Sequence, residues 1–184
     1  MSIDARPSSN GRGSDAWYRP WTHITVDRRS PGYCRVSFDH PPANTITATT
    51  VAELTELVEL IEQDQDLNVV VFDSAGPDFY LAHYDAEHDP AWLDLLVRLS
   101  RAPVVSIASI RGRVGGAGGD FVLACDLRFA SRDTTLLGRL CGYVNRTLAD
   151  DLLDDEVDRI ASRLARLDRD AIARTKFYAD RVTL

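Results

Sequence analysis

Apolar residues recur along the chain with two periods, and these periods predict alternating strands and helices. Two short alternating runs within residues 22–39, joined by Ser-Pro-Gly at 30–32, are typical of a β-hairpin with one apolar face. Continuous β-branched runs at 68–73 and 104–110 predict buried strands of a mostly parallel sheet, and a shorter apolar run at 127–130 predicts another strand. The pattern therefore indicates a hairpin followed by parallel strands.

Longer stretches between and after these strands carry apolar residues at helical spacing. The first, at 51–61, is expected to begin at an N-cap formed by Thr49 or Thr50. Further helices are expected at residues 90–101, 151–167 and 169–182. In the helix over 151–167 the predicted inward stripe is Val157, Ile160, Leu164 and Leu167, opposite Asp155, Asp158, Arg159 and Arg163.

Glycines cluster after the predicted strand at 104–110, at positions 112, 115, 116, 118 and 119, and an apolar helical segment follows at 121–125. A helix that begins at such a turn directs unpaired N–H groups outward from its positive dipole end, so it can hold a phosphate or stabilise a developing oxyanion. No Lys-Ser or Lys-Thr follows the glycines, and the dinucleotide spacing G-x-G-x-x-G does not fit. What remains is an oxyanion turn with a carboxylate, Asp120, beside it.

Two segments of the chain resemble the enoyl-CoA hydratase/isomerase (crotonase) family. Residues 112–126, G-R-V-G-G-A-G-G-D-F-V-L-A-C-D, lie without a gap over the family signature G-x-x-x-G-G-G-x-E-L-A-L-A-C-D. Residues 74–85, S-A-G-P-D-F-Y-L-A-H-Y-D, resemble the family's F-x-A-G-A-D segment, and the two segments occur in the family's order. The resemblance implies an α/β fold, a crotonase-like spiral of β-β-α units that is truncated here and followed by C-terminal helices. It also implies an acyl-CoA thioester as the substrate, with coenzyme A as part of that substrate and no separate cofactor.

The resemblance also assigns roles to individual residues. The backbone N–H of Tyr84 would be the first oxyanion donor, because Tyr84 follows the position of the family's Ala-Gly pair. Ala82 stands at the alanine of that pair and would line the coenzyme A site. The N–H of Ala117 would be the second donor, where the family has its middle glycine. Asp120 falls at the family's first glutamate, one methylene shorter, and would act as acid/base. Lys176 is the nearest candidate for a late basic residue that contacts the coenzyme A phosphates.

Several of these residues also have simpler interpretations. Asp120 could instead stabilise the helix start, which is worth about 0.3–1 kcal/mol, and Lys176 could be a solvated helix lysine. Asn44 falls at a family asparagine, but a turn former before the next helix is the preferred interpretation. Asp126 is expected to be structural, hydrogen-bonded near a strand start, and Cys125 to be a packed thiol.

The loop H-Y-D-A-E-H-D superficially resembles a metal site. Its potential ligands are His83, Asp85, Glu87, His88 and Asp89. No regular element would place these side chains on one face, and metal sites require a defined ligand geometry. We therefore expect no metal site.

The chain departs from the family after about residue 138. Family members continue through an L-G-Q-P-E-like stretch that carries a second catalytic glutamate, whereas here L-G at 137–138 runs almost directly into G-Y-V-N at 142–145. This pattern predicts an internal deletion that removed the second acid and part of the acyl pocket. Hydration needs one carboxylate to activate water and a second group to deliver a proton. Isomerisation needs proton transfer by only one carboxylate, so it is mechanistically easier here than hydration. Two hypotheses follow: an enoyl-CoA hydratase/isomerase-like enzyme with impaired activity, or a non-catalytic relic or partner subunit that binds acyl-CoA or associates with intact family members.

Composition limits the expected partners and cellular location of the protein. A net charge of −7 over 184 residues argues against nucleic acid or an anionic membrane surface as a partner. The three cysteines show no zinc-like spacing, and no secretory or membrane-spanning run is present in the sequence, so a cytoplasmic location is expected. We expect a disordered tail at 1–20, an α/β core at 21–140 and a helical segment at 141–184. In the family such C-terminal helices pack between subunits, which implies a homotrimer or higher oligomer unless the deletion prevents it.

Overall fold

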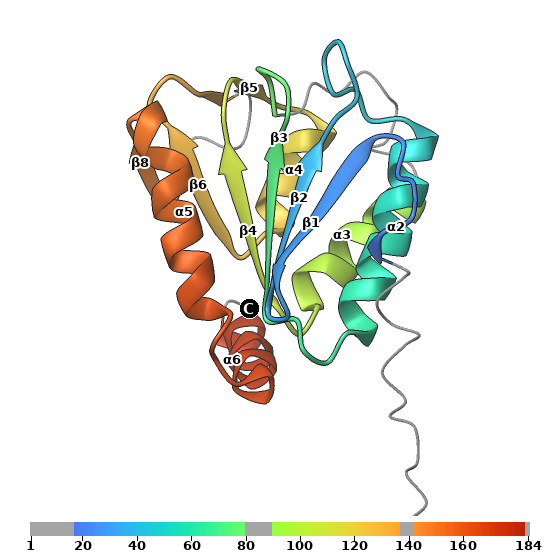
Figure 1. Ribbon diagram of the computed structural model, residues 1–184, viewed down its shortest axis with the longest axis vertical. Coiled ribbons are helices and arrows are strands. Elements are labelled where there is room, and N and C mark those ends of the chain that lie inside the picture. Colours follow the sequence, from blue (N-terminus) through green and yellow to red (C-terminus); the bar gives the residue numbers. More distant parts are fainter. Residues whose placement is uncertain (1–16, 80–89, 137–141, 183–184) are drawn as a thin grey trace, which may run out of the picture.

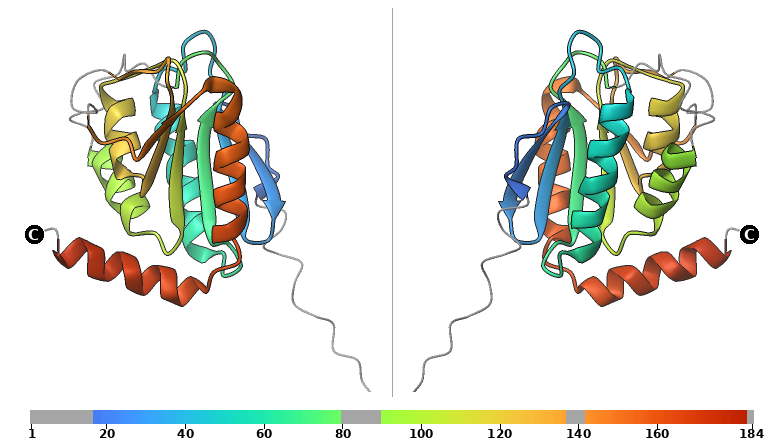
Figure 2. Two further views of the ribbon diagram at one scale, coloured as in Figure 1. Left: turned by 90° about the vertical axis from the view of Figure 1, so that its left-hand side faces the viewer. Right: turned by 90° about the vertical axis from the view of Figure 1, so that its right-hand side faces the viewer.

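The structure is a computed structural model that describes residues 17–79, 90–136 and 142–182. Its strands are β1 (Ile24–Ser30), β2 (Tyr33–Phe38), β3 (Val69–Ser74), β4 (Val105–Ile110), β5 (Arg113–Val114), β6 (Leu127–Ser131), β7 (Thr135–Leu136) and β8 (Arg146–Leu148). Its helices are α2 (Ala48–Gln63), α3 (Pro90–Arg101), α4 (Ala117–Ala124), α5 (Asp150–Leu164) and α6 (Arg169–Val182). Helices α2, α3 and α4 cover one face of the large sheet, α5 covers the other, and α6 lies below it (Figures 1 and 2).

The large sheet has the order β1-β2-β3-β4-β6-β8, and β5 pairs separately with β7. Strands β1 and β2 pair antiparallel, which confirms the predicted hairpin, and the other neighbours in the large sheet are parallel. Strand–strand–helix units repeat along the chain, as in β1-β2-α2 and β4-β5-α4. Because β2, β3 and β4 are parallel, the loops that follow them emerge at one edge of the sheet.

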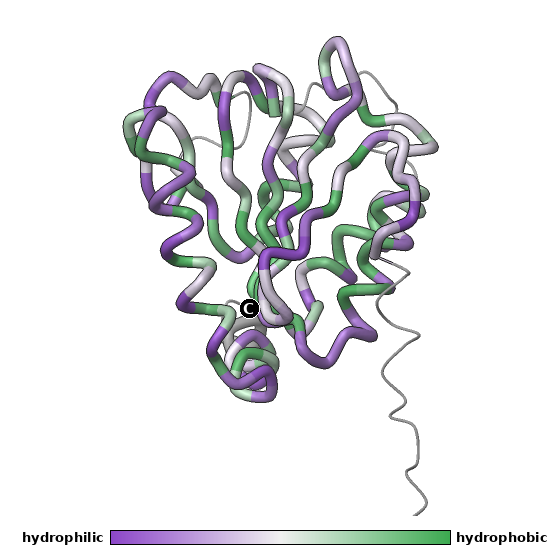
Figure 3. The backbone as a smooth tube through the Cα atoms, in the orientation of Figure 1, coloured by the Kyte–Doolittle hydropathy of each residue, from purple (hydrophilic) through white to green (hydrophobic). Residues whose placement is uncertain are grey.

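Strands β2, β3, β4 and β6 divide their side chains between two apolar layers. Cys34, Val36 and Phe38 of β2 pack with the layer under α2, α3 and α4, whereas Tyr33 packs with the layer under α5. In the first layer the Phe121 ring meets Phe72 edge-on at 5.0 Å and Phe38 at 5.4 Å between centroids. Apolar residues accordingly line the strands and the inward sides of the helices (Figure 3). Burial of this surface is the main favourable term in folding.

The N-cap of helix α2 lies two residues before Thr49 and three before Thr50, the two predicted caps. Thr47 is the N-cap: its hydroxyl accepts a hydrogen bond from the Thr50 N–H, and the Thr50 hydroxyl accepts one from the Thr47 N–H. This reciprocal pair is a capping box. The predicted cap at Thr49 or Thr50 is therefore wrong, because Thr50 serves the box from the third helical position.

Helix α5 differs from the prediction at its end and on one side. It ends at Leu164, and Leu167 is exposed rather than part of an inward stripe. The residues that it buries are Leu153, Val157 and Ala161. Asp158, predicted on the outward side, instead accepts hydrogen bonds from the Tyr33 hydroxyl and the Arg35 guanidinium of β2. That prediction is wrong because a cation buried in the sheet provides a partner for the carboxylate.

Arg35 joins the sheet to α5. Its buried guanidinium donates from Nε to Asp73 at 2.6 Å, from Nη2 to Asp154 at 2.7 Å and from Nη1 to Asp158 at 2.8 Å. Arg111, directly after β4, donates to Asp154 and to the first turn of α5 as well. A charge taken out of water is costly unless it is paired and hydrogen-bonded. The docking of α5 therefore depends on these two arginines and the aspartates around them.

The two ends of the chain differ in part from the expected boundaries. Trp17, within the stretch predicted as a tail, is buried, and the Arg28 guanidinium lies 4.8 Å from the centre of its ring. Residues 1–16 lie outside the described residues. The segment after 141 contains two helices as expected, and it also adds β8 to the large sheet beside β6.

Replacing Arg35 with alanine should destabilise the fold by about 3 kcal/mol or more, because Asp73 and its neighbours would lose their buried counter-ion. Urea unfolding at neutral pH measures this. Arg159→Ala is the matched control: Arg159 is an exposed arginine of α5 that pairs with Glu156, and its loss should leave the midpoint almost unchanged. Similar midpoints for the two variants would contradict the role given to Arg35.

His23 and His40 stack next to the start of α2, with ring centroids 3.8 Å apart. His23 Nδ1 lies 2.8 Å from the Thr50 hydroxyl, and Glu53 accepts a hydrogen bond from the His23 backbone N–H at 2.9 Å. Burial, and after it the neighbouring His40, lower the pKa of His23 below its ordinary 6.5, and Glu53 only partly opposes them.

Wild-type stability should therefore fall more steeply than that of a His23→Gln variant between about pH 7 and pH 5. A histidine whose pKa is lower in the folded state stabilises the fold above its unfolded-state pKa, and this contribution is lost as the pH falls through the lowered value. Urea midpoints measured across this range for both proteins test it. Parallel curves would show that His23 is not the titrating group.

Candidate functional site

Three backbone segments meet at the edge of the sheet where the parallel strands end. They are the 40s loop (residues 40–44) after β2, the β3 turn (residues 74–79) and the glycine turn (residues 111–116) between β4 and α4. In open α/β sheets, ligands bind outside the carboxyl ends of the strands. This edge is therefore the place to look for the predicted oxyanion site.

Asn44 ties the 40s loop to the β3 turn. Its backbone has φ 49°, in the left-handed region that suits a turn, and its side chain is buried. The side-chain Oδ1 accepts a hydrogen bond from His40 N at 2.8 Å, and Nδ2 donates to Ser74 Oγ at 2.5 Å and to the Asp78 carbonyl at 3.0 Å. The interpretation of Asn44 as a turn former is confirmed, and the structure adds this anchoring role.

The β3 turn is fastened to the glycine turn by backbone and side-chain contacts. Phe79 N donates to Arg111 O at 3.2 Å. Asp78 Oδ1 accepts from Arg113 N at 2.9 Å and from Nε at 3.2 Å, and Oδ2 accepts from Nη2 at 2.8 Å. The hydrogen bonds from Arg113 hold the pKa of Asp78 below its ordinary value. Nothing in the sequence pattern marked Asp78 or Arg113 as partners.

Gly112 lies where the two turns approach most closely. Its φ is +62°, and a Cβ at this position would lie 1.8 Å from the Pro77 carbonyl oxygen. Both the conformation and the space exclude a side chain. This close approach explains why a glycine opens the signature segment.

Helix α4 begins directly after the glycine turn, with Gly116 as its N-cap and Ala117 as its first residue. It starts four residues before the predicted apolar segment, so the last glycines of the cluster form its first turn. Gly119 N donates to Gly115 O and Asp120 N to Gly116 O, which leaves the N–H groups of Ala117 and Gly118 without an acceptor in the described part of the chain. Ala117 is buried. Asp120 lies in the same first turn, so the structure brings together two of the predicted site residues.

The first predicted oxyanion donor, the N–H of Tyr84, cannot be placed relative to Ala117. Tyr84 and Ala82 lie outside the described residues, as does the metal-like loop at 83–89. Among the residues that the structure describes, no group of three or more histidine, cysteine, aspartate or glutamate side chains is arranged to hold a metal ion. In the same residues, no helix is long and apolar enough to cross a membrane.

Lys176 lies at the opposite end of the sheet from Ala117 and Asp120. Its Nζ donates to the Val104 carbonyl at 3.0 Å and to Asp126 Oδ2 at 2.9 Å, at the start of β4 and β6. The side chain is 13% exposed, so the interpretation as a solvated lysine is wrong. Its contact with coenzyme A phosphates stays a prediction.

Two neighbouring predictions are confirmed. Asp126 is structural: its Oδ2 accepts from both the N–H and the hydroxyl of Ser106, each at 2.8 Å, just before β6 begins. Cys125 is a packed thiol, and burial raises its pKa well above the ordinary value.

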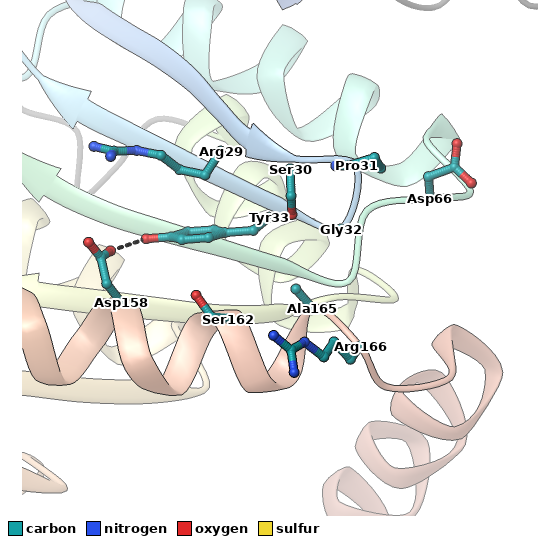
Figure 4. A pocket seen from close by; sticks show the side chains of 10 residues that line it. All are labelled: Arg29, Ser30, Pro31, Gly32, Tyr33, Asp66, Asp158, Ser162, Ala165 and Arg166. Carbon is teal, nitrogen blue, oxygen red and sulfur yellow. Dashed lines mark hydrogen bonds between the residues drawn. The ribbon is translucent and has the colours of Figure 1, made fainter.

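A cavity of about 640 Å³ lies at the other end of the sheet, between the β1–β2 turn and the end of α5 (Figure 4). Its lining residues are Arg29, Ser30, Pro31, Gly32, Tyr33, Asp66, Asp158, Ser162, Ala165 and Arg166. Two arginines and two aspartates balance its charge, and Asp158 is already paired with Tyr33 and Arg35. It includes none of the predicted site residues.

The sequence model of the enoyl-CoA hydratase/isomerase family matches residues 28–139. The chain belongs to this family. The match covers both signature segments and ends beside the predicted deletion. Comparison with curated proteins gives no match.

Solved structures share the fold of this chain. A protein from Streptomyces avermitilis assigned as an enoyl-CoA hydratase is 29% identical, with a TM-score of 0.79 over 90% of this chain and 80% of its own. An enoyl-CoA hydratase from Mycobacterium avium subsp. paratuberculosis K-10 has a TM-score of 0.80 at 20% identity, covering 90% and 87%. An enoyl-CoA hydratase/isomerase from Marinobacter aquaeolei has a TM-score of 0.77 at 18% identity, over 87% of this chain and 83% of its own. The expected crotonase-like fold with C-terminal helices is confirmed.

Replacing Gly112 with alanine should lower the free energy of unfolding by about 3 kcal/mol or more, because the new Cβ would overlap the Pro77 carbonyl at a positive φ. Denaturant unfolding measures this. Gly142→Ala separates the two causes: Gly142 has φ +96° but no described atom within 4 Å of a Cβ, so only the conformational cost of about 1 kcal/mol is expected. An equal loss in both variants would contradict the close approach.

Proposed function

We propose that this chain acts on an acyl-CoA thioester as an enoyl-CoA hydratase/isomerase-like enzyme that stabilises a thioester enolate. The observation that carries the proposal is the first turn of α4. It combines the buried Ala117, whose N–H has no acceptor among the residues that the structure describes, with the Asp120 carboxylate in the family's signature segment. The second donor, the N–H of Tyr84 beside Ala82, is carried over from the family resemblance. Coenzyme A enters as part of the substrate, and no separate cofactor is needed.

The chemistry requires charge stabilisation and one proton carrier. Asp120 would remove a proton from a carbon conjugated with the thioester carbonyl, and the electron pair would move onto the carbonyl oxygen, where the N–H donors hold it. Returning the proton to a different carbon shifts the double bond, so an isomerisation balances with one carboxylate. Loss of one such donor typically reduces the rate by ~10²–10³. Aspartate is shorter than glutamate by one methylene, and a misplacement near 1 Å can cost roughly a hundredfold.

We also propose that the connection between β7 and β8 is a shortened form of the family's. Ser131 and Leu148 are partners in neighbouring strands, and Arg128 N donates to Asn145 Oδ1 at 2.8 Å. The chain thus leaves β6 and returns beside it, so a long excursion at this point can be removed without separating the strands. The loss would take the second glutamate with it, which favours isomerisation over hydration and predicts impaired activity.

A non-catalytic role is the second candidate, and the surface of α6 favours it. Phe177 and Tyr178 of α6 are 53% and 65% exposed, and Leu167, two residues before α6, is 49% exposed. Exposed apolar patches can mark contact sites for other proteins. A subunit that binds acyl-CoA, or that associates with intact family members or with copies of itself as a homotrimer, would cover them. The free thiols of Cys34 and Cys125 are compatible with the reducing cytoplasm, where we propose that the protein acts.

Asp120→Ala should abolish turnover of an enoyl-CoA substrate, because no other described carboxylate occupies the family's position. The assay follows double-bond migration and hydration with a short and a long enoyl-CoA. Asp151→Ala is the matched control, since Asp151 is also an acid in the first turn of a helix. If Asp120 only stabilises its helix, both variants lose about 0.3–1 kcal/mol of stability and neither loses turnover.

Calorimetry with crotonyl-CoA tests the non-catalytic candidate. Heat of binding without turnover is expected for a binding subunit, and heat only in the presence of an intact family member is expected for a partner subunit. No heat in either titration removes both roles.

A further inference from the structure

Asp78 and Arg113 join the two segments that border the candidate site, and the family resemblance assigned no role to either residue. We propose that this pair, the Asp78–Arg113 clasp, sets the position of the oxyanion-binding backbone, so that both are positioning residues that do not touch the substrate. The inference rests on the proposed function, because it concerns the same site.

The clasp is anchored at both ends. Asp78 is held at its carbonyl by Asn44 Nδ2 at 3.0 Å and by Ser74 Oγ at 2.7 Å, which leaves its carboxylate directed to the glycine turn. Arg113 belongs to β5, which pairs with β7 through Arg113 and Thr135, and it lies four residues before Ala117. The guanidinium is therefore a short, forked link between two fixed pieces of backbone.

The clasp fixes the distance between the β3 turn and the glycine turn. Catalysis by backbone donors requires their N–H groups to be held at defined positions. The glycine turn leads directly into Ala117, the proposed donor that the structure describes. The distance between the β3 turn and the glycine turn therefore affects where the Ala117 N–H lies. Two hydrogen bonds remain when the guanidinium is removed: Phe79 N still donates to Arg111 O, and Arg113 N still donates to the Asp78 carboxylate. The turns would stay together but their separation would be less strictly defined.

The exposure of Arg113 separates positioning from stability. Its side chain is 58% exposed while that of Asp78 is 13% exposed. An ion pair with one solvated partner contributes little to stability, so a merely structural role predicts almost no effect on any measurement. A positioning role predicts lost turnover without lost stability.

The experiment compares Arg113→Ala, Asp78→Ala and the double variant in the full chain, with Arg146→Ala as control. Arg146 is 57% exposed and pairs with Glu156 of α5, so it matches Arg113 in exposure and partner type. We expect kcat for enoyl-CoA isomerisation to fall about 10- to 100-fold in each single variant, with KM within about twofold of wild type. The double variant should be no worse than Asp78→Ala alone, because Asp78→Ala already removes both the guanidinium link and the acceptor of Arg113 N. Arg113→Lys, which keeps the charge without the fork, should recover part of kcat.

Three results would overturn the clasp: an unchanged kcat, a rise in KM at constant kcat, or losses that multiply in the double variant. The second would mean that Arg113 contacts the substrate's phosphates directly. If wild type turns over no enoyl-CoA, the proposed function fails, and amide hydrogen exchange still tests the clasp. Exchange should then accelerate at residues 74–79 and 111–120 in Arg113→Ala and not in Arg146→Ala, and equal rates in the two variants refute it.

Discussion

Gly112 lies so close to the Pro77 carbonyl that a Cβ would not fit between them, and the candidate site depends on this approach. Because no side chain separates them, Arg111 O can accept the Phe79 N–H and Arg113 can reach Asp78. The same turn sends the chain through β5 into α4, so Ala117 begins its helix at a defined place. A wider separation would leave the two turns as independent loops.

The opposite face of the sheet is organised by charge rather than by close packing alone. Arg35 and Arg111 hold the aspartates of α5 over strands that are otherwise apolar. Arg111 belongs to this network through its side chain and to the candidate site through its carbonyl. The C-terminal segment is thus linked to the candidate site through Arg111.

Family membership and catalytic capacity are separate properties of this chain. Family membership rests on residues 28–139, which contain both signature segments, whereas a role in catalysis rests on the proposed function. Enolate formation needs donors and one proton carrier, and water addition needs a further group. A chain with one carboxylate at the site would therefore retain the simpler half of the family's chemistry, or only its binding.

Local pattern determined the hairpin, the buried strands, the helix at α3 and the glycine turn, because period, β-branching and turn residues act over a few positions. The same reasoning misplaced the cap of α2, since adjacent threonines are equally good candidates until the helix start is known. It turned Asp158 outward, since the buried arginine that attracts it lies 123 residues away in sequence. Arg113 and Asp78 are 35 residues apart and carry no periodic signal, so only the tertiary structure could pair them. Contacts between distant side chains depend on how elements pack, and that information is not contained in any one stretch of sequence.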